Sequence, residues 1–112
     1  MNIVSDQRPW GGFARFTHNE PSTVKILTVN EGQETSLQFH HDRQEFWHVL
    51  SGEPLVTLGE KQTEGVPGQE FFVEKEMRHR IAAPKGKVEI LEISFGDFRE
   101  DDIVRVEDRY GR

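Results

Sequence analysis

The residues in this sequence that are best suited to chemistry are an amide, two imidazoles and a carboxylate. Gln38 and His40 stand two positions apart, so both side chains point to the same face of a β-strand. Glu45 follows a short turn and opens the next strand, and His79 can supply a second imidazole. This donor set suits a divalent first-row metal that keeps positions open for a substrate, although the spacing alone also fits surface residues.

The composition limits what else the chain can be. It has 112 residues, twenty acidic and fourteen basic side chains, a formal charge of -6 and no cysteine. This length predicts one domain, and any metal must have nitrogen and oxygen ligands. Scattered basic residues disfavour nucleic acid as a partner. Because we find neither a signal-peptide pattern nor a membrane-spanning apolar run, we expect a cytoplasmic protein without a membrane partner.

Short strands are the elements that must position these donors. Phenylalanine and β-branched residues recur in runs broken by Gly, Pro and acidic turns, which is typical of an all-β sandwich or barrel. The expected strands span 13–18, 23–30, 35–40, 45–51, 55–58, 70–73, 79–83 and 87–95. We therefore predict one domain over 1–112, with an N-terminal arm (1–12), a barrel (about 13–95) and a C-terminal tail (96–112).

Two of the expected strands carry apolar residues on both faces. One contains Val24 and Ile26 on one face with Leu27 and Val29 on the other, and the strand 87–95 has the same character. A strand of this kind needs a covering layer on each side. A small chain has little material for the outer layer, so we predict a homodimer.

The order of the candidate ligands resembles the first motif of the cupin superfamily. That motif places two histidines and a glutamate between two glycines, and a second motif places a last histidine eleven positions after a glycine. The matching residues are Gly32, Gln38, His40, Glu45 and Gly52, then Gly68 and His79. The departures are Gln38 for the first histidine, Glu74 and Glu76 for proline and glycine, and Ala83 for asparagine. The resemblance implies a cupin double-stranded β-helix, a jelly-roll barrel.

A longer resemblance points to one branch of the cupins. It is carried by 36–47, by Arg8-Pro9-Trp10-Gly11, and by segments at 24–25, 49–52, 79–81, 91–93, 100–105 and 108–112. These resemble the C-terminal cupin domain of type II phosphomannose isomerases, which are fused to GDP-mannose pyrophosphorylases. Phe46 and Ser94 depart from that pattern. We expect a stand-alone cupin domain, since a nucleotidyltransferase needs more length and a Gly-rich phosphate loop.

The resemblance implies an isomerase that interconverts mannose 6-phosphate and fructose 6-phosphate in mannose and polysaccharide-precursor metabolism. It implies one divalent metal (Zn, Mn, Co, Ni or Fe) on Gln38, His40, Glu45 and His79. The reaction needs a base, an electrophile for the developing oxyanion and protection from water. Lys25 and Glu92 are the two candidate bases, and a Lys25–Glu92 ion pair or a solvent-facing Lys25 are the competing interpretations.

Two arginines are the expected clamps for the sugar phosphate, because guanidinium matches phosphate with paired hydrogen bonds. They are Arg43 and Arg80, and Arg43 is also a candidate partner of Glu45. Two other functions stay open. Phe46 and Ser94 favour a non-enzymatic, metal-containing carbohydrate-binding or regulatory cupin. A two-histidine, one-carboxylate set also serves non-haem metal oxygenases.

Overall fold

The protein is built from β-strands alone. The computed structural model describes residues 3–111, and its strands are β1 (Val4–Arg8), β2 (Gly11–Arg15), β3 (Ser22–Val29), β4 (Leu37–Phe39), β5 (Gln44–Ser51), β6 (Leu55–Leu58), β7 (Lys61–Glu64), β8 (Glu70–Val73), β9 (His79–Ala82), β10 (Val88–Phe95) and β11 (Val104–Glu107). The all-β prediction is confirmed. In this range no helix is long and apolar enough to cross a bilayer. Residues 1, 2 and 112, the ends of the expected arm and tail, lie outside the described part.

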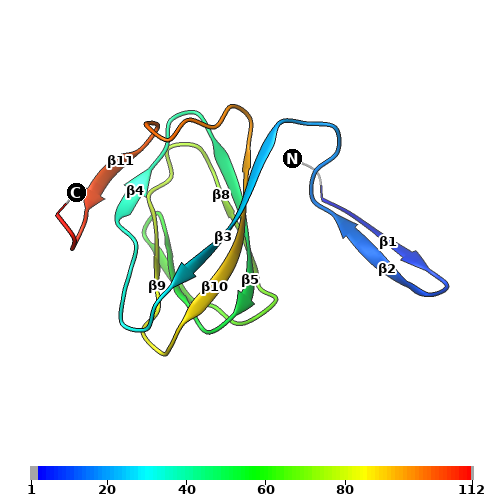
Figure 1. The fold of residues 1–112 in the computed structure, drawn as a ribbon, viewed down its shortest axis with the longest axis horizontal. Coiled ribbons are helices and arrows are strands. Elements are labelled where there is room, and N and C mark those ends of the chain that lie inside the picture. The colour runs from blue at the N-terminus through cyan, green and yellow to red at the C-terminus, as the bar shows by residue number, and fades with distance from the viewer. Residues whose placement is uncertain (1–2, 112) are drawn as a thin grey trace.

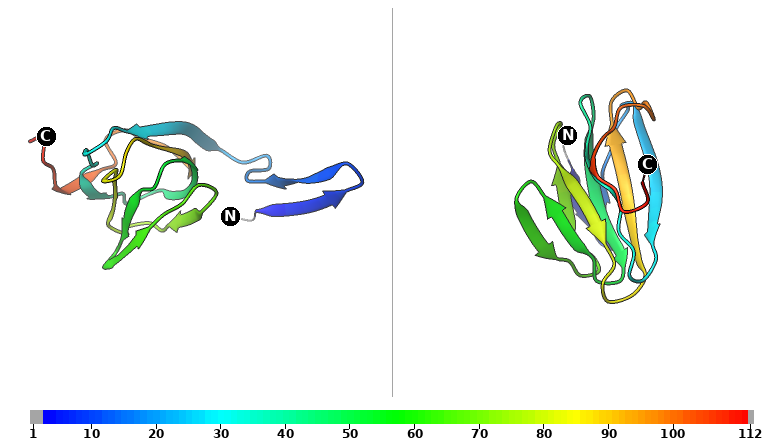
Figure 2. Two further views of the ribbon diagram at one scale, coloured as in Figure 1. Left: turned by 90° about the horizontal axis from the view of Figure 1, so that it is seen from below. Right: turned by 90° about the vertical axis from the view of Figure 1, so that its left-hand side faces the viewer.

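Two antiparallel sheets face each other and form the barrel (Figures 1 and 2). One sheet has the order β3-β10-β5-β8 and the other the order β11-β4-β9-β6-β7, so most neighbours are distant in sequence. The core lies between the sheets. Its central residues, all at most 2% exposed, are Trp47, Val49, Val56, Ile81 and Ile90. The spacing of short strands predicts a sandwich or barrel, and the arrangement found is the jelly roll that the cupin resemblance implies.

The strand β3 shows how alternation selects the residues that face the core. Lys25 and Leu27 are partly buried and Val29 is buried, whereas Val24 and Ile26 are each 57% exposed. The predicted covering of both faces is therefore not found for β3 within one chain, whereas Ile93 on the outer face of β10 is buried in a cluster that Ile3 and Phe16 pack against. Lys25 thus points to the interior of the barrel, and the outer face of β3 exposes aliphatic side chains to solvent.

The N-terminal strand differs from its prediction. The expected barrel strand 13–18 is instead β2, which pairs with β1 in a separate hairpin that projects from the barrel (Figure 1). The barrel sheets begin at Ser22 rather than near residue 13. The physical reason is that the strand conformation is interrupted between residues 16 and 21. Asn19 adopts a positive φ of 52°, and Pro21 follows it. Phe16 belongs to the connection and stacks on Phe46, with ring centroids 5.3 Å apart.

Three strands were absent from the prediction: β1 of the hairpin, and β7 and β11 of the barrel. The segment expected as a tail contains β11, which pairs with β4, and β7 pairs with β6 at the far edge of the same sheet. Both are edge strands with mostly exposed residues; β7 is wholly polar, and β11 alternates two valines with Arg105 and Glu107. Edge strands are commonly short and exposed, so they give little hydrophobic signal in the sequence.

Candidate metal centre

Three of the four predicted ligands converge at one point inside the barrel. His40 follows β4, Glu45 lies on β5 and His79 opens β9, and one donor atom from each lies within 4.8 Å of the others. The Glu45 carboxylate faces both rings, with 3.5 Å to His40 Nε2 and 3.9 Å to His79 Nε2. All three side chains are buried. The sequence interpretation of these residues as one cluster therefore agrees with the geometry.

The two imidazoles are held in the tautomer whose Nε2 carries the lone pair, and His40 Nε2 lies 3.2 Å from Nη2 of Arg43, a contact that a bound metal would replace. His40 Nδ1 donates to the carbonyl of Asp102 at 2.5 Å, and His79 Nδ1 donates to the carbonyl of Met77 at 3.0 Å. Burial lowers the pKa of both rings, which favours the neutral, metal-binding form. Backbone acceptors of this kind orient metal-ligating histidines in proteins.

Glu45 is oriented by two neighbouring donors. The indole Nε1 of Trp47 donates to Oε1 and Nε of Arg43 donates to Oε2, each at 3.1 Å. Burial by itself raises the pKa of Glu45, but the electrostatic interaction with the facing imidazoles, a hydrogen bond with Glu92 and the Arg43 guanidinium outweigh it and lower the pKa. The side chain is thus held as a carboxylate, the form that binds a cation.

Gln38 lies beside the cluster as the fourth candidate donor. Its backbone is in register with His79 across β4 and β9, and its amide nitrogen lies 3.4 Å from His79 Nε2. The hydroxyl of Ser36 donates to the amide oxygen at 2.6 Å. A hydroxyl both donates and accepts, so the amide can rotate its oxygen toward the imidazoles without losing the Ser36 partner. The residues therefore fit a divalent metal with two nitrogen and two oxygen donors.

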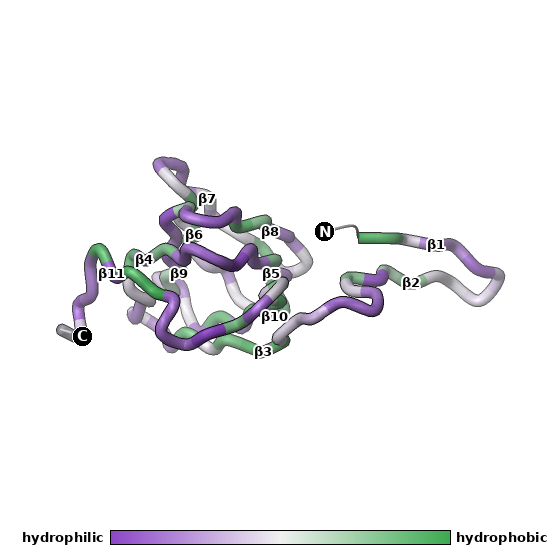
Figure 3. The backbone as a smooth tube through the Cα atoms, turned by 90° about the horizontal axis from the view of Figure 1, so that it is seen from above, coloured by the Kyte–Doolittle hydropathy of each residue, from purple (hydrophilic) through white to green (hydrophobic). Residues whose placement is uncertain are grey.

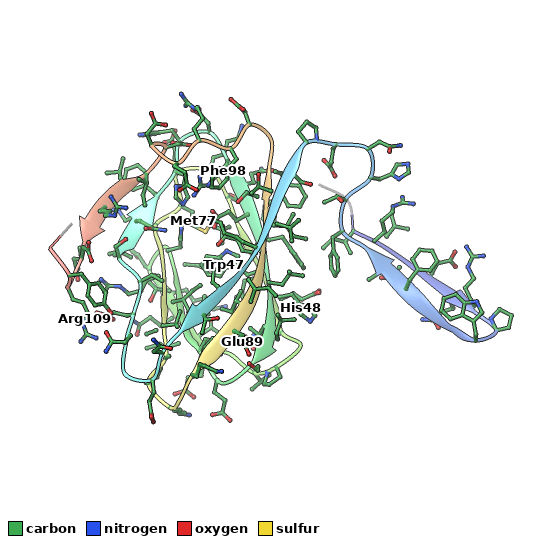
Figure 4. The ribbon with its side chains drawn as sticks, viewed as in Figure 1. Trp47, His48, Met77, Glu89, Phe98 and Arg109 are labelled. Atoms are coloured by element: carbon green, nitrogen blue, oxygen red, sulfur yellow. The ribbon has the colours of Figure 1, made fainter. Side chains whose placement is uncertain are left out.

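A cavity of about 650 Å³ adjoins the cluster, a volume suited to a small ligand. Lys25, Glu92 and Trp47 line it from three adjacent strands, since Glu92 is in register with Lys25 on β3 and with Trp47 on β5. Burial, followed by the charge of Glu45 and a hydrogen bond with it, raises the pKa of Glu92 to about 8. Figure 4 shows Trp47 inside the barrel. Both candidate bases therefore reach the same space as the candidate ligands.

Arg43 and Arg80 lie in very different places. Arg43 is 7% exposed, donates to Glu45 and to the carbonyl of Arg99, and lies 4.2 Å from the ring centroid of Phe98. Its bonds indicate that it positions the carboxylate, the second role that the sequence suggested. Arg80 is not brought to the cavity, because it alternates with the inward-facing His79 and donates instead to the carbonyl of Thr35.

Sequence reasoning missed the part that the C-terminal segment plays. Asp102, which falls in the expected C-terminal tail (96–112), is buried and accepts hydrogen bonds from the backbone N–H groups of His41 and Asp42 at 2.9 and 3.0 Å. Together with its carbonyl it secures the turn that follows His40. The same segment also lines the cavity through Glu100, Ile103, Arg105 and Tyr110. The sequence signals for this are the matches of 100–105 and 108–112 to the phosphomannose isomerase pattern.

His41 and His48 lie outside the cluster. His41 is exposed and its ring meets Phe39 edge-on. His48 points away from the interior on the outer face of β5 (Figure 4), where Nδ1 lies 2.8 Å from the carboxylate of Glu70. Neither is within reach of the candidate metal ligands.

Solved structures share the fold of the barrel. The fold is similar to that of oxalate decarboxylase from Bacillus subtilis, with a TM-score of 0.71 and 18% identity over 78% of this chain and 24% of that one. It is also similar to the capsular polysaccharide assembling protein CapF from Staphylococcus aureus, with a TM-score of 0.70 and 14% identity over 95% of this chain and 34% of that one. At this identity the likeness shows the fold alone, and it confirms the predicted jelly roll.

The sequence then identifies the branch. The family model described as mannose-6-phosphate isomerase C-terminal matches residues 3–108, and the chain belongs to this family. Relatives include the xanthan biosynthesis protein XanB of Xanthomonas campestris, 40% identical over 94% of this chain and 23% of XanB. The alginate biosynthesis protein AlgA of Pseudomonas aeruginosa is 41% identical over 100% of this chain and 24% of AlgA. The chain thus spans less than a quarter of these relatives.

Proposed function

We propose that the chain is a metal-dependent aldose–ketose isomerase that interconverts mannose 6-phosphate and fructose 6-phosphate. The observation that carries the proposal is one cavity bordered both by a buried two-imidazole, one-carboxylate cluster and by two groups able to move protons. Family membership supports the substrate, and the names of XanB and AlgA support a role in polysaccharide-precursor supply. A phosphorylated metabolite as substrate also supports a cytoplasmic location.

The chain's own residues supply most of what the reaction needs. A divalent metal held by Gln38, His40, Glu45 and His79 would supply the electrophile that stabilises negative charge on the substrate oxygens. Proton transfer between the adjacent carbons falls to Lys25 or Glu92. Burial raises the pKa of Glu92 to about 8, toward neutral pH, where its protonated form can donate a proton and its carboxylate form can accept one. The surrounding barrel wall shields this exchange from bulk water.

The isomerase proposal predicts metal-dependent turnover. Protein stripped of metal should convert no mannose 6-phosphate, and zinc, manganese, cobalt or nickel supplied singly should restore formation of fructose 6-phosphate. A coupled assay that detects fructose 6-phosphate measures this directly. If the protein binds metal but turns over nothing with any of them, the carbohydrate-binding alternative replaces the isomerase. Oxygen uptake by the iron-loaded protein would instead support the oxygenase alternative.

We also propose that the chain forms a homodimer through the outer face of the β3-β10-β5-β8 sheet. Val24 and Ile26 are exposed to solvent on this face, and Figure 3 shows the apolar stretch along β3. The β1-β2 hairpin projects from the barrel with Trp10 74% exposed and Phe13 42% exposed. Because an isolated two-stranded sheet is marginally stable, the hairpin needs a covering surface, which a second copy supplies.

The dimer proposal predicts that a charge on this face dissociates the protein. Ile26→Glu should shift the sedimentation-equilibrium mass from two chains to one, because burial of an unpaired carboxylate opposes association. Gln62→Glu, which adds the same charge on exposed β7, is the matched control and should remain dimeric. An unchanged mass for Ile26→Glu excludes this face as the interface.

A further inference from the structure

One cationic side chain that lines the cavity, Arg105, has no role in the metal centre described above. Three cationic side chains line the cavity: Lys25, Arg43 and Arg105. Arg43 is engaged by Glu45, and the Lys25 ammonium lies 4.8 Å from the ring centroid of Phe98. Within residues 3–111, Arg105 makes no ion pair, side-chain hydrogen bond or ring contact. Its guanidinium is therefore available to a ligand.

The position of Arg105 relates it directly to the candidate metal centre. On β11 it stands opposite Gln38 of β4, so both side chains lie on the same face of the sheet, and both line the cavity. Opposed residues of antiparallel strands have Cα atoms about 4.5–5.5 Å apart. The register of β11 shifts immediately afterwards, between Arg105 and Glu107. Such bulges redirect side chains and are common next to active sites.

Glu34 and Glu100 are acidic groups of the same cavity lining, and within residues 3–111 neither forms an ion pair with Arg105. The Glu34 carboxylate already faces Arg80 at 3.9 Å and Arg109 at 3.8 Å. Arg109 lies beside the C-terminus, away from Trp47 in the interior (Figure 4). The Tyr110 hydroxyl donates to the Gln33 side chain and joins this segment to the barrel. The C-terminal segment is thus held where Arg105 can meet a ligand.

We propose that Arg105 binds the phosphate of the substrate and so selects phosphorylated over unphosphorylated sugars. This inference rests on the proposed isomerase function and deepens it. A guanidinium donates paired hydrogen bonds to a phosphate, and its charge is unaffected by pH in the physiological range. With the phosphate at Arg105, the sugar carbons extend from β11 past Gln38 toward the imidazoles. Arg105 therefore takes the role that the sequence assigned to Arg80.

The test compares affinities for fructose 6-phosphate, fructose and inorganic phosphate in the full, zinc-loaded chain. Arg105→Ala should weaken fructose 6-phosphate and phosphate binding by about 10- to 100-fold, the usual effect of losing hydrogen bonds to a charged group, and leave fructose binding unchanged. Arg105→Lys should recover part of the loss. Lys61→Ala removes the same charge from exposed β7 and should bind like the unmodified chain. Arg105 is exposed, so the substitution leaves the core intact.

The outcomes separate this inference from the isomerase proposal. If Arg105→Ala binds phosphate and fructose 6-phosphate as tightly as the unmodified chain, the inference is wrong even where turnover is present. If no turnover occurs but Arg105→Ala alone loses phosphate affinity, the isomerase proposal fails and the anion site stands. If the unmodified chain binds neither phosphate nor fructose 6-phosphate, both are overturned.

Discussion

Replacing either His40 or His79 by Ala should reduce bound metal to background. Each change removes one of the two Nε2 donors that face Glu45, and two nitrogen ligands set the affinity of such a site for first-row metals. The measurement is the metal content per chain by elemental analysis, after loading with zinc and exhaustive dialysis. Near-UV circular dichroism checks that the core around Trp47 is retained.

His48→Ala is the matched control for the metal experiment. It removes an imidazole from β5, the strand that carries Glu45, but from the outer face where His48 meets Glu70. This variant should keep its metal. Unchanged metal content in both the His40 and His79 variants would rule out the site, and an equal loss in His48→Ala would show that the metal is bound elsewhere.

Lys25→Met should abolish exchange of the carbon-2 proton of mannose 6-phosphate while leaving the metal content unchanged. The side chain lines the cavity from β3 and belongs to none of the candidate ligand contacts, so its loss removes a proton-transfer group rather than a donor. Removal of a general base slows such steps by about 10²- to 10⁴-fold. Deuterium incorporation at carbon 2 in heavy water, followed by NMR, measures the exchange separately from product formation.

The Glu92→Gln variant tests the second candidate for the base that removes the carbon-2 proton. Glu92 is the cross-strand neighbour of Lys25, so the two variants probe the same region of the cavity. If Lys25→Met retains exchange and Glu92→Gln loses it, the base is Glu92. Lys61→Met, on exposed β7, is the control for loss of a lysine charge and should exchange at the normal rate.

Local sequence was enough to group Gln38, His40 and Glu45 and to indicate an all-β sandwich or barrel. The resemblance to the cupins supported His79 as the second imidazole and implied the jelly roll. The two-residue period of a strand places Gln38 and His40 on one face, and the short turn before Glu45 keeps the carboxylate near them. The same period separates Trp47 from Phe46, which the structure buries in different clusters. These relations depend on residues close together in the chain, so spacing alone predicts them.

Only the tertiary structure decided which distant groups complete the site. The contact between His40 and Asp102 joins residues 62 positions apart, and β11 brings Arg105 opposite Gln38 from the far end of the chain. Pairing of this kind depends on how the two sheets close around the core, and a strand as short and exposed as β11 carries too little hydrophobic pattern to predict its partner. The sequence therefore determined the candidate ligands and the jelly roll, while the packed barrel decided that Arg43 supports Glu45, that Arg80 faces outward and that the C-terminal segment lines the cavity.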